Sequence, residues 1–380
     1  MKIVMVYTRF MDPVGKDRSV GGIQTYLFNL GQMCVKYHHE PIIYQASSRY
    51  FREQIGPISV VGVPAINLNT RKGKNQLVQA AISGIDLKRD LLIFGSDGYA
   101  TDIGSNRCIS IQHGIEWDLP SKYSHSRSRL RRILGDSIYQ LIRRRRAINA
   151  YLQCPNRVCV DYNFHNWLRT YLIDDLPGRN WVILNAANIA SEEAFSTRVK
   201  HNNSVRILFA RRFHRYRGTQ IMAEAARKLL VKYQNIQFTF AGEGPDESWL
   251  KEFFRNEDRI QFIKFDPEQS LYIHLQHDIA VVPSLASEGS SLSVSEAMGA
   301  GCAVVATAVG GITNMIMNGY NGFLCMPTAS DLQKQLEILI NDDEGRFRMG
   351  ARAYDTAKEA LSLDRWQKSW AQVINEVANE

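Results

Sequence analysis

Two glutamates, Glu288 and Glu296, stand in an E-x7-E pattern whose intervening residues are mostly small. A short β-branched run at 278–282 precedes them and ends at Pro283, as buried strands often do, and a helical pattern begins at Leu292. We therefore expect a strand, a loop and the start of a helix. Small side chains leave backbone amides uncovered, and a helix start also offers a positive dipole end, so a phosphate would fit there.

A simpler interpretation uses the same residues. Ser290, Ser291 and Ser293 are good helix caps, and Glu296 would be a first-turn acid that complements the helix dipole. Because Ser and Glu are common at helix starts, these residues alone favour capping over ligand binding.

The length and composition of the chain limit the classes of protein to consider. A chain of 380 residues, 45% of them hydrophobic, is long for one core and predicts two globular domains. No apolar run is long enough to span a bilayer, and the opening MKIVMVYTRF is too short for a secretory leader, so we expect a cytoplasmic protein. Six scattered cysteines without a C-x-x-C pair predict reduced, buried thiols rather than a zinc site or disulfides.

Positive charge is concentrated in the first half of the chain, where residues 1–190 hold 25 Lys and Arg against 14 Asp and Glu, a net charge of +11. The stretch 126–146 sets eight arginines around an apolar helical face. Such a helix can lie on an anionic membrane, or it can pack on the core with a solvated arginine face. Nucleic acid is the weakest alternative, because no aromatic residues are interleaved with the arginines. The patch that would meet a membrane or an acceptor comprises Arg131, Arg132, Arg143, Arg144, Arg145 and Arg146.

Strand-like and helix-like segments alternate along the chain, which predicts parallel sheets with ligands at the carboxyl ends of the strands. After the first predicted strand, Gly22 opens a helix and would let the backbone approach a ligand closely. His113 ends a later strand, which makes it a better functional candidate than most isolated histidines. The polar, unpatterned stretch 190–204 is the expected linker between the two domains.

In combination, the E-x7-E pair and the AMGAGCAVVATAVGG segment behind it resemble the donor-binding signature of glycosyltransferase family 4. This family transfers sugars from nucleotide sugars with retention of configuration. Residues 211–218 are similar to its G-R-L-x-x-x-K-G pattern: Arg212 is kept, Arg211 stands for the first Gly, and Arg217 stands for Lys. Without the downstream glutamates, the simpler interpretation would be that these arginines form an exposed charged stretch without a ligand.

The resemblance is dense from 206 to 323, and thin from 41 to 100, where acceptors bind. It implies an α/β fold of the GT-B type, with two Rossmann-like domains, a cleft between them and a C-terminal helix that crosses back to the first domain. We expect an acceptor-binding domain at 1–190, a nucleotide-sugar-binding domain at 191–360, and the crossing helix at 361–380.

The resemblance also implies roles for individual residues. Glu288 would hold a sugar hydroxyl and favour positive charge at the anomeric carbon, and His113 would face the transferred sugar; these are the two expected catalytic residues. The donor diphosphate would be bound by Gly22, Arg212, Arg217, Leu292 and Ser293. Ser291 and Glu296 would contact the donor sugar and ribose, and the base would lie near Ile263, Lys264 and Phe265.

The implied activity is that of a retaining glycosyltransferase without a metal or other cofactor, because arginines and a helix dipole would do the work of magnesium. Its partners would be a nucleoside-diphosphate sugar and a glycan or polyprenyl-linked acceptor, with no nucleic acid. The acceptor would belong to a cell-surface polysaccharide such as O-antigen, lipopolysaccharide or capsule, made at the inner face of the membrane.

The identity of the donor sugar stays open, because Ser290 and Ser291 replace the family's frequent Phe-Gly and add hydroxyls beside the expected donor. Two other functions also stay open. One is a non-hydrolysing sugar-nucleotide epimerase of the same fold. The other is a basic membrane-surface binding protein with a vestigial pocket.

Overall fold

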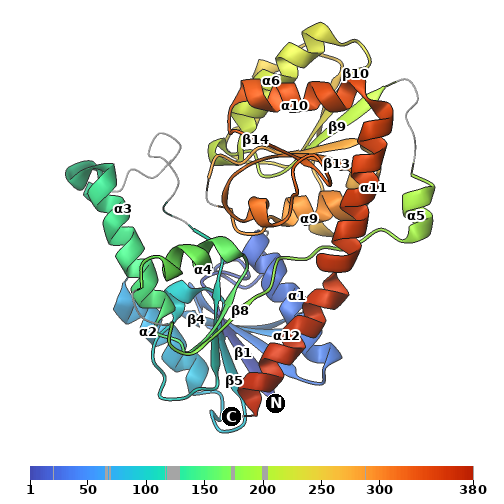
Figure 1. The fold of residues 1–380 in the computed structure, drawn as a ribbon. Helices are drawn as coiled ribbons and strands as arrows, with labels where there is room; N and C mark the ends of the chain where they lie inside the picture. Colours follow the sequence, from blue (N-terminus) through green and yellow to red (C-terminus); the bar gives the residue numbers. More distant parts are fainter. Residues whose placement is uncertain are drawn as a thin grey trace. The chain divides into compact units, whose positions relative to one another are not determined.

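The computed structural model of the chain describes residues 1–19, 21–64, 67, 70–115, 117, 129–172, 176–198, 204–286 and 288–379, and leaves out the side chains of Arg129, Leu130 and Arg132. The chain divides into two compact units (Figure 1). Unit 1 comprises Met1–His113, Leu141–Ile183 and Trp366–Glu380, and unit 2 comprises Gly114–Gln140 and Leu184–Arg365.

Unit 1 is built on a sheet with the strand order β3-β4-β2-β1-β5-β6-β7-β8. Neighbouring strands pair in parallel, except that β3 pairs antiparallel with β4 at the edge. The central strands are apolar runs buried on both faces, as parallel sheets require. The strands are β1 (Lys2–Val6), β2 (Glu40–Ser47), β3 (Phe51–Ile55), β4 (Ile58–Pro64), β5 (Leu91–Phe94), β6 (Cys108–Gln112), β7 (Asn156–Cys159) and β8 (Arg179–Val182).

The helices that accompany these strands carry apolar residues on one face. They are α1 (Gly22–Lys36), α2 (Arg71–Ile82), the short η1 (Asp97–Tyr99), α4 (Tyr162–Arg169) and the second half of α3 (Arg129–Tyr151), whose first half up to Gln140 is assigned to unit 2. The Asp161 carboxylate caps α4 by accepting hydrogen bonds from the amides of Asn163 and Phe164, at 2.8 and 3.2 Å.

The last helix, α12 (Leu363–Ala378), begins in unit 2 and continues as part of unit 1. Trp370 is fully buried there, and its indole N–H donates to the Tyr26 hydroxyl of α1 at 2.9 Å. The Tyr26 ring also meets Trp366 edge to face, with ring centres 5.0 Å apart. The C-terminal helix therefore crosses back to the first unit, as predicted.

Unit 2 is built on a fully parallel sheet with the strand order β11-β10-β9-β12-β13-β14. Successive strands run outward from β9 to one edge and then restart at β12 on its other side, so the strand order reverses between β9 and β12. The strands are β9 (Val205–Ala210), β10 (Ile236–Ala241), β11 (Ile260–Ile263), β12 (Ile279–Val282), β13 (Ala303–Thr307) and β14 (Phe323–Cys325).

The helices of unit 2 close two apolar layers around its sheet, with Phe209, Phe238 and Phe240 in one and Met298 and Val304 in the other. They are α5 (Glu192–Ser196), η3 (Arg215–Arg217), α6 (Thr219–Lys232), α7 (Glu247–Phe253), η4 (Pro267–Gln269), α8 (Ser270–Leu275), α9 (Leu292–Gly299), η5 (Gly310–Asn314), α10 (Ala329–Asn341) and α11 (Asp343–Ala360).

Two stretches contain structural details that the sequence patterns did not indicate. The expected linker contains helix α5, which Ser191 caps through the amide of Ala194, and Phe195 stacks on Tyr354 of α11 with ring centres 4.2 Å apart. Residues 199–203 of the same stretch lie outside the described residues. The basic stretch is not one straight helix, because Gly135 adopts φ 76° and ψ 167° and breaks α3 into two parts.

The predictions about thiols and membrane spans can also be compared with the structure. All six cysteines are buried and free, as predicted, and the sulfur atoms of Cys108 and Cys154 lie 3.4 Å apart. Within the described residues, no helix combines the length and the apolar character needed to cross a bilayer.

Candidate functional site

The candidate residues of unit 2 follow β9 and β12, the two strands at which the sheet reverses its order. Arg211 comes directly after β9, and the loop 283–291 comes directly after β12 and leads into α9. In open parallel sheets, ligands bind outside the carboxyl ends of the strands at this reversal point. The topology therefore brings the arginine-rich segment and the glutamate loop to the place where a ligand is expected.

Three side chains donate hydrogen bonds to one oxygen of Glu288. Arg211 Nη2 donates to Glu288 Oε1 at 2.5 Å, and Arg217 and Ser284 donate to the same atom. Arg211 also donates through Nη1 to the Ser284 hydroxyl. Two guanidinium groups against one carboxylate leave a positive charge in excess, which suits an anionic ligand.

Glu288 is ionised under all ordinary conditions. Burial would raise the pKa of its carboxyl, but the charges of Arg211 and Arg217 outweigh burial and lower the pKa to about 2. A carboxylate with such a low pKa is a poor proton donor or acceptor near neutral pH. Glu288 therefore suits electrostatic stabilisation and hydrogen bonding, the role predicted for it, better than general acid or base catalysis.

The amino end of α9 is not capped by a side chain. Its N-cap residue, Ser291, makes no capping hydrogen bond, and Ser293 directs its hydroxyl to the Ala210 carbonyl at 3.5 Å. Among the described residues, the amides of Leu292 and Ser293 have no hydrogen-bond acceptor. The capping interpretation is therefore wrong for these serines, and two backbone donors are left for a ligand.

Ser290 has a structural role that the sequence did not reveal. Its hydroxyl accepts a hydrogen bond from the Asn185 amide at 2.8 Å, and Asn185 Nδ2 donates to the Ser290 carbonyl at 2.5 Å. The Ser295 hydroxyl donates to the Asn185 carbonyl at 2.9 Å. The Ser290 hydroxyl thus binds Asn185, and its expected place beside the donor stays a prediction. Asn185 lies in the segment VILNAAN (182–188), which is similar to the V-I-P-N-G-V-D segment of glycosyltransferase family 4, and this similarity is the sequence signal that could have found it.

Glu296 lies in the second turn of α9, so the prediction of a first-turn acid was wrong. Its side chain is partly buried, and it lies near the hydroxyl of Ser270 on α8. Burial raises the pKa of Glu296 to about 7, although the Ser270 hydroxyl and the charge of Arg211 both act to lower it. The protonation state of Glu296 therefore changes near neutral pH.

The remaining predicted residues of unit 2 lie at the same edge of the sheet. Arg212 is exposed and has no partner among the described residues. Ile263 ends β11, and its carbonyl accepts a hydrogen bond from the Gly242 amide at 2.9 Å. Phe265 packs on a small apolar cluster at the sheet, and Lys264 is exposed and paired with Glu243 at 3.1 Å.

Gly22 and His113 belong to unit 1. Gly22 is the exposed first residue of α1, whose N-cap position is another glycine without a capping side chain. His113 follows β6, its Nε2–H donates to the Gly95 carbonyl at 2.8 Å, and its ring meets Tyr26 of α1 edge to face. Burial lowers the pKa of His113 to about 4, so the imidazole is neutral and offers Nδ1 as an acceptor.

The predicted basic patch lies on α3. Arg143 and Arg144 are partly buried, Arg145 and Arg146 are exposed, and Arg131 pairs with Asp136 at 2.6 Å. The side chain of Arg132 lies outside the described residues. At least two of the predicted arginines are therefore exposed to solvent.

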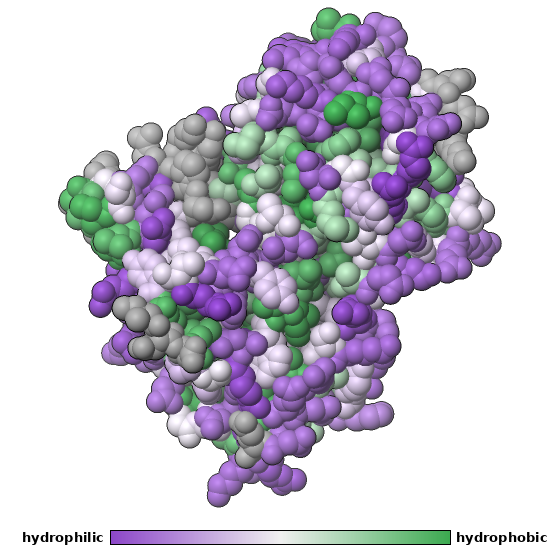
Figure 2. Space-filling model, in the orientation of Figure 1, coloured by the Kyte–Doolittle hydropathy of each residue, from purple (hydrophilic) through white to green (hydrophobic). Residues whose placement is uncertain are grey.

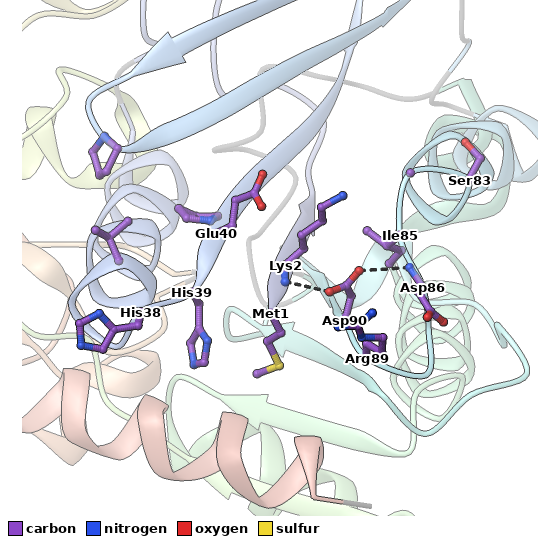
Figure 3. A pocket seen from close by; sticks show the side chains of 14 residues that line it. Met1, Lys2, His38, His39, Glu40, Ser83, Ile85, Asp86, Arg89 and Asp90 are labelled. Atoms are coloured by element: carbon purple, nitrogen blue, oxygen red, sulfur yellow. Dashed lines mark hydrogen bonds between the residues drawn. The ribbon is translucent and has the colours of Figure 1, made fainter.

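A groove of about 1060 Å³ in unit 1 is a different kind of site (Figure 3). It lies at the amino ends of β1 and β2, the edge of the sheet opposite to the one where ligands bind. Asp90 in its wall accepts hydrogen bonds from the amides of Lys2 and Asp86, at 2.8 and 3.1 Å. Asp90 is therefore occupied by hydrogen bonds to the backbone, which is a structural role. The groove is not part of the candidate site.

No group of three or more His, Cys, Asp or Glu side chains is arranged to hold a metal ion within the part of the chain that the structure describes.

Part of the second unit is similar in sequence to known proteins. Residues 191–356 match the family model described as "Glycosyl transferases group 1". A D-inositol 3-phosphate glycosyltransferase of Corynebacterium aurimucosum is 28% identical over 184 residues, which cover 46% of this chain and 42% of that protein. The aligned part thus spans less than half of the length of this relative.

Solved structures resemble the whole chain. A sucrose-phosphate synthase from Thermosynechococcus elongatus aligns with a TM-score of 0.75 at 16% identity, over 99% of this chain and 98% of that one. HepE of Anabaena, in complex with UDP, aligns with a TM-score of 0.69 at 17% identity, over 99% and 100% of the two chains. At such low identity the likeness shows the fold, and it confirms the predicted GT-B architecture of two parallel-sheet domains.

The raised pKa of Glu296 predicts a stability effect that is independent of function. Its folded-state pKa of about 7 lies above the unfolded value, so the folded protein binds the proton more tightly. Stability from this group is complete at low pH and is lost as the pH rises through 7. We expect Glu296→Gln to lack this loss. The melting temperature of the variant minus that of the wild type should therefore increase as the pH rises from 5.5 to 8.5.

Thermal unfolding of both proteins across this pH range measures the effect. Glu337→Gln is the matched control, because its carboxylate is on α10 and its pKa is lowered by Gln333 and Lys232. A melting-temperature difference for Glu296→Gln that is constant with pH would contradict the assignment.

Proposed function

We propose that this chain is a glycosyltransferase that moves a sugar from a nucleoside-diphosphate sugar to a glycan or lipid-linked glycan acceptor, with retention of configuration. Its setting would be cell-surface polysaccharide synthesis at the cytoplasmic face of a membrane. The observation that carries the proposal is the cationic, uncapped anion site at the reversal point of the second sheet, in the segment that matches the glycosyltransferase family model.

The donor diphosphate is a good match for this site. The free amides of Leu292 and Ser293 and the exposed Arg212 would bind its oxygens, and Arg217 would add a second guanidinium. Breaking a sugar–phosphate bond leaves negative charge on the diphosphate, and these donors would stabilise that charge. HepE, which has the same fold, was solved with UDP and with UDP-glucose.

Glu288 and Glu296 would serve the other parts of the donor. Glu288, ionised and fixed, would accept a hydrogen bond from a sugar hydroxyl and stabilise positive charge that develops at the anomeric carbon. Glu296 in its ionised form would accept two hydrogen bonds from the ribose diol. In unit 1, Gly22 and neutral His113 would contribute a backbone amide and a hydrogen-bond acceptor.

A panel of nucleotide sugars, each with glycan and polyprenyl-linked acceptors, tests the proposal through release of nucleoside diphosphate and formation of acceptor-linked sugar. We expect one donor to give both products. Release or conversion of the donor without acceptor-linked sugar would favour hydrolysis or epimerisation, and a protein that binds no nucleotide sugar is not a transferase.

With the active donor, Glu288→Gln is expected to lower kcat by about 100-fold, a loss of the size seen when one preorganised electrostatic group is removed. Glutamine keeps the shape of the side chain and removes its charge. Alanine is less informative, since the structure shows that it would leave Arg211 buried without its partner. Glu337→Gln is the control, and equal turnover in both variants would remove Glu288 from the mechanism.

Helix α3 supports the membrane part of the proposal. Ile133, Ile138 and Leu141 are 68%, 51% and 54% exposed, and apolar surface gathers at the outer end of α3 in Figure 2. Ile138, Leu141 and Arg145 follow at helical spacing, so a strip with apolar side chains and a guanidinium faces solvent. Such a strip suits the interface of an anionic membrane, where Arg can reach the headgroups.

We expect replacing Arg145 and Arg146 by Gln to weaken binding to phosphatidylglycerol vesicles by about 30-fold, because each basic residue near the surface contributes about 1 kcal/mol. Co-sedimentation measures the binding. The control replaces two exposed basic residues of unit 2, Arg255 and Lys334, by Gln. Equal sedimentation of the two double variants would leave α3 with no part in membrane binding.

A further inference from the structure

The two arginines that bind Glu288 differ in their surroundings. The Arg211 side chain is 4% exposed, whereas that of Arg217 is 28% exposed. A buried guanidinium must keep its carboxylate partner, because an unpaired charge in the interior is costly. A partly exposed guanidinium can exchange its partner for water or a ligand at much lower cost.

The backbone of Arg211 is held by contacts at the ends of two strands. Its amide donates to the Ala241 carbonyl at 2.9 Å, and its own carbonyl packs against Gly242, where φ is +142° and a Cβ atom would collide with it. The backbone that carries Arg211 is therefore fixed between β9 and β10. Arg217 lies at the end of the short turn η3, where its amide donates to the His214 carbonyl at 2.8 Å.

The contacts of the two guanidinium groups differ in the same sense. Arg211 uses both arms of its fork, one on Glu288 and one on Ser284, and Ser284 itself donates to Glu288. This triangle fixes the carboxylate from two directions. Arg217 reaches Glu288 through a single nitrogen, while its guanidinium also lies 4.9 Å from the ring centre of Tyr216.

We propose that Arg211 is the positioning residue of Glu288 and that, together with Ser284, it keeps this carboxylate in place and ionised, so that Arg217 can leave Glu288 and bind the donor diphosphate. The inference rests on the function proposed above. In the G-R-L-x-x-x-K-G pattern this position is a glycine, which offers no side chain to a carboxylate, so the arrangement belongs to this chain's own sequence.

This division of work solves an electrostatic problem. When an anionic diphosphate takes Arg217, Glu288 loses one of its two cations and also faces a new negative charge nearby. With Arg211 and Ser284 still in place, Glu288 keeps a cation and a hydrogen-bond donor on Oε1. If Arg211 were absent when the diphosphate takes Arg217, the buried Glu288 carboxylate would have no cation beside it and would take up a proton.

The first test measures unfolding of the donor-free protein and needs no activity. The melting temperatures of wild type, Arg211→Met, Glu288→Gln and the double variant form a cycle that reports the coupling of the two side chains. We expect Arg211→Met to lower the melting temperature in the wild type and to lower it much less, or to raise it, in the Glu288→Gln background. Equal losses in both backgrounds would overturn the pairing.

The second test compares Arg211→Met with Arg217→Met in the transfer assay. For Arg211→Met we expect a fall in kcat that deepens toward acid pH, about tenfold for each pH unit below the new pKa of Glu288, with little change in the donor KM. For Arg217→Met we expect a raised donor KM and the pH profile of the wild type. Arg215→Met, on the same turn, is the charge-matched control.

Arg211→Lys keeps the positive charge but lacks the second arm of the guanidinium. Compared with Arg211→Met, it should therefore recover most of the transfer activity at acid pH but little of the contact with Ser284. Two results would overturn the inference and leave the transferase proposal intact. One is a wild-type pH profile of kcat in Arg211→Met, and the other is the same fall of kcat at acid pH in Arg217→Met. If the wild type transfers no sugar, the proposed function fails, and the unfolding cycle alone decides whether Arg211 holds Glu288.

Discussion

The candidate site depends on one oxygen atom, Oε1 of Glu288, on which Arg211, Arg217 and Ser284 converge. A buried carboxylate is stable only when charges and hydrogen bonds compensate for lost water. The three donors come from the end of β9, from η3 and from the loop after β12. The charge requirement of one side chain thus ties together the segments that form the edge of the second sheet.

Close backbone packing supports this arrangement. Gly218 adopts φ +84° beside the Pro283 carbonyl, and a Cβ atom at this position would collide with that carbonyl. On the other side of the loop, Gly311 packs against Gly289 and donates its amide to the Glu288 carbonyl at 3.0 Å. The loop that carries Glu288 is therefore held by main-chain contacts as well as by ion pairs, so its side chain has little freedom.

The sequence predicted the architecture well, because fully buried parallel strands are nearly continuous apolar runs. β5 and β13 are examples in which every residue is buried. β3 was missed, since FREQI is a mostly exposed edge strand and carries no such run. The break at Gly135 was missed as well, because a glycine within a helical pattern is compatible with both a straight and a broken helix.

The site was predicted less completely than the fold. Sequence patterns found the E-x7-E pair and the arginine segment, but neighbouring residues of an extended chain point to opposite sides. Arg211 therefore contacts Glu288, which the patterns did not predict, whereas the diphosphate-binding role expected of its neighbour Arg212 stays a prediction. Asn185 escaped notice because its contacts with Ser290 span 105 residues. The domain boundaries at 190 and 360 stay predictions.

The place of helix α12 in the fold determines when unit 1 can complete its folding during synthesis. Unit 1 contains both the first and the last stretches of the chain, and the Trp370–Tyr26 hydrogen bond joins residues 344 positions apart. All residues of unit 2 have been synthesised before Trp366 and Trp370 emerge. Unit 1 is consequently begun first and completed last. Until Trp366 and Trp370 are in place, the aromatic surface of α1 around Tyr26 is exposed, and chaperones can bind such surfaces.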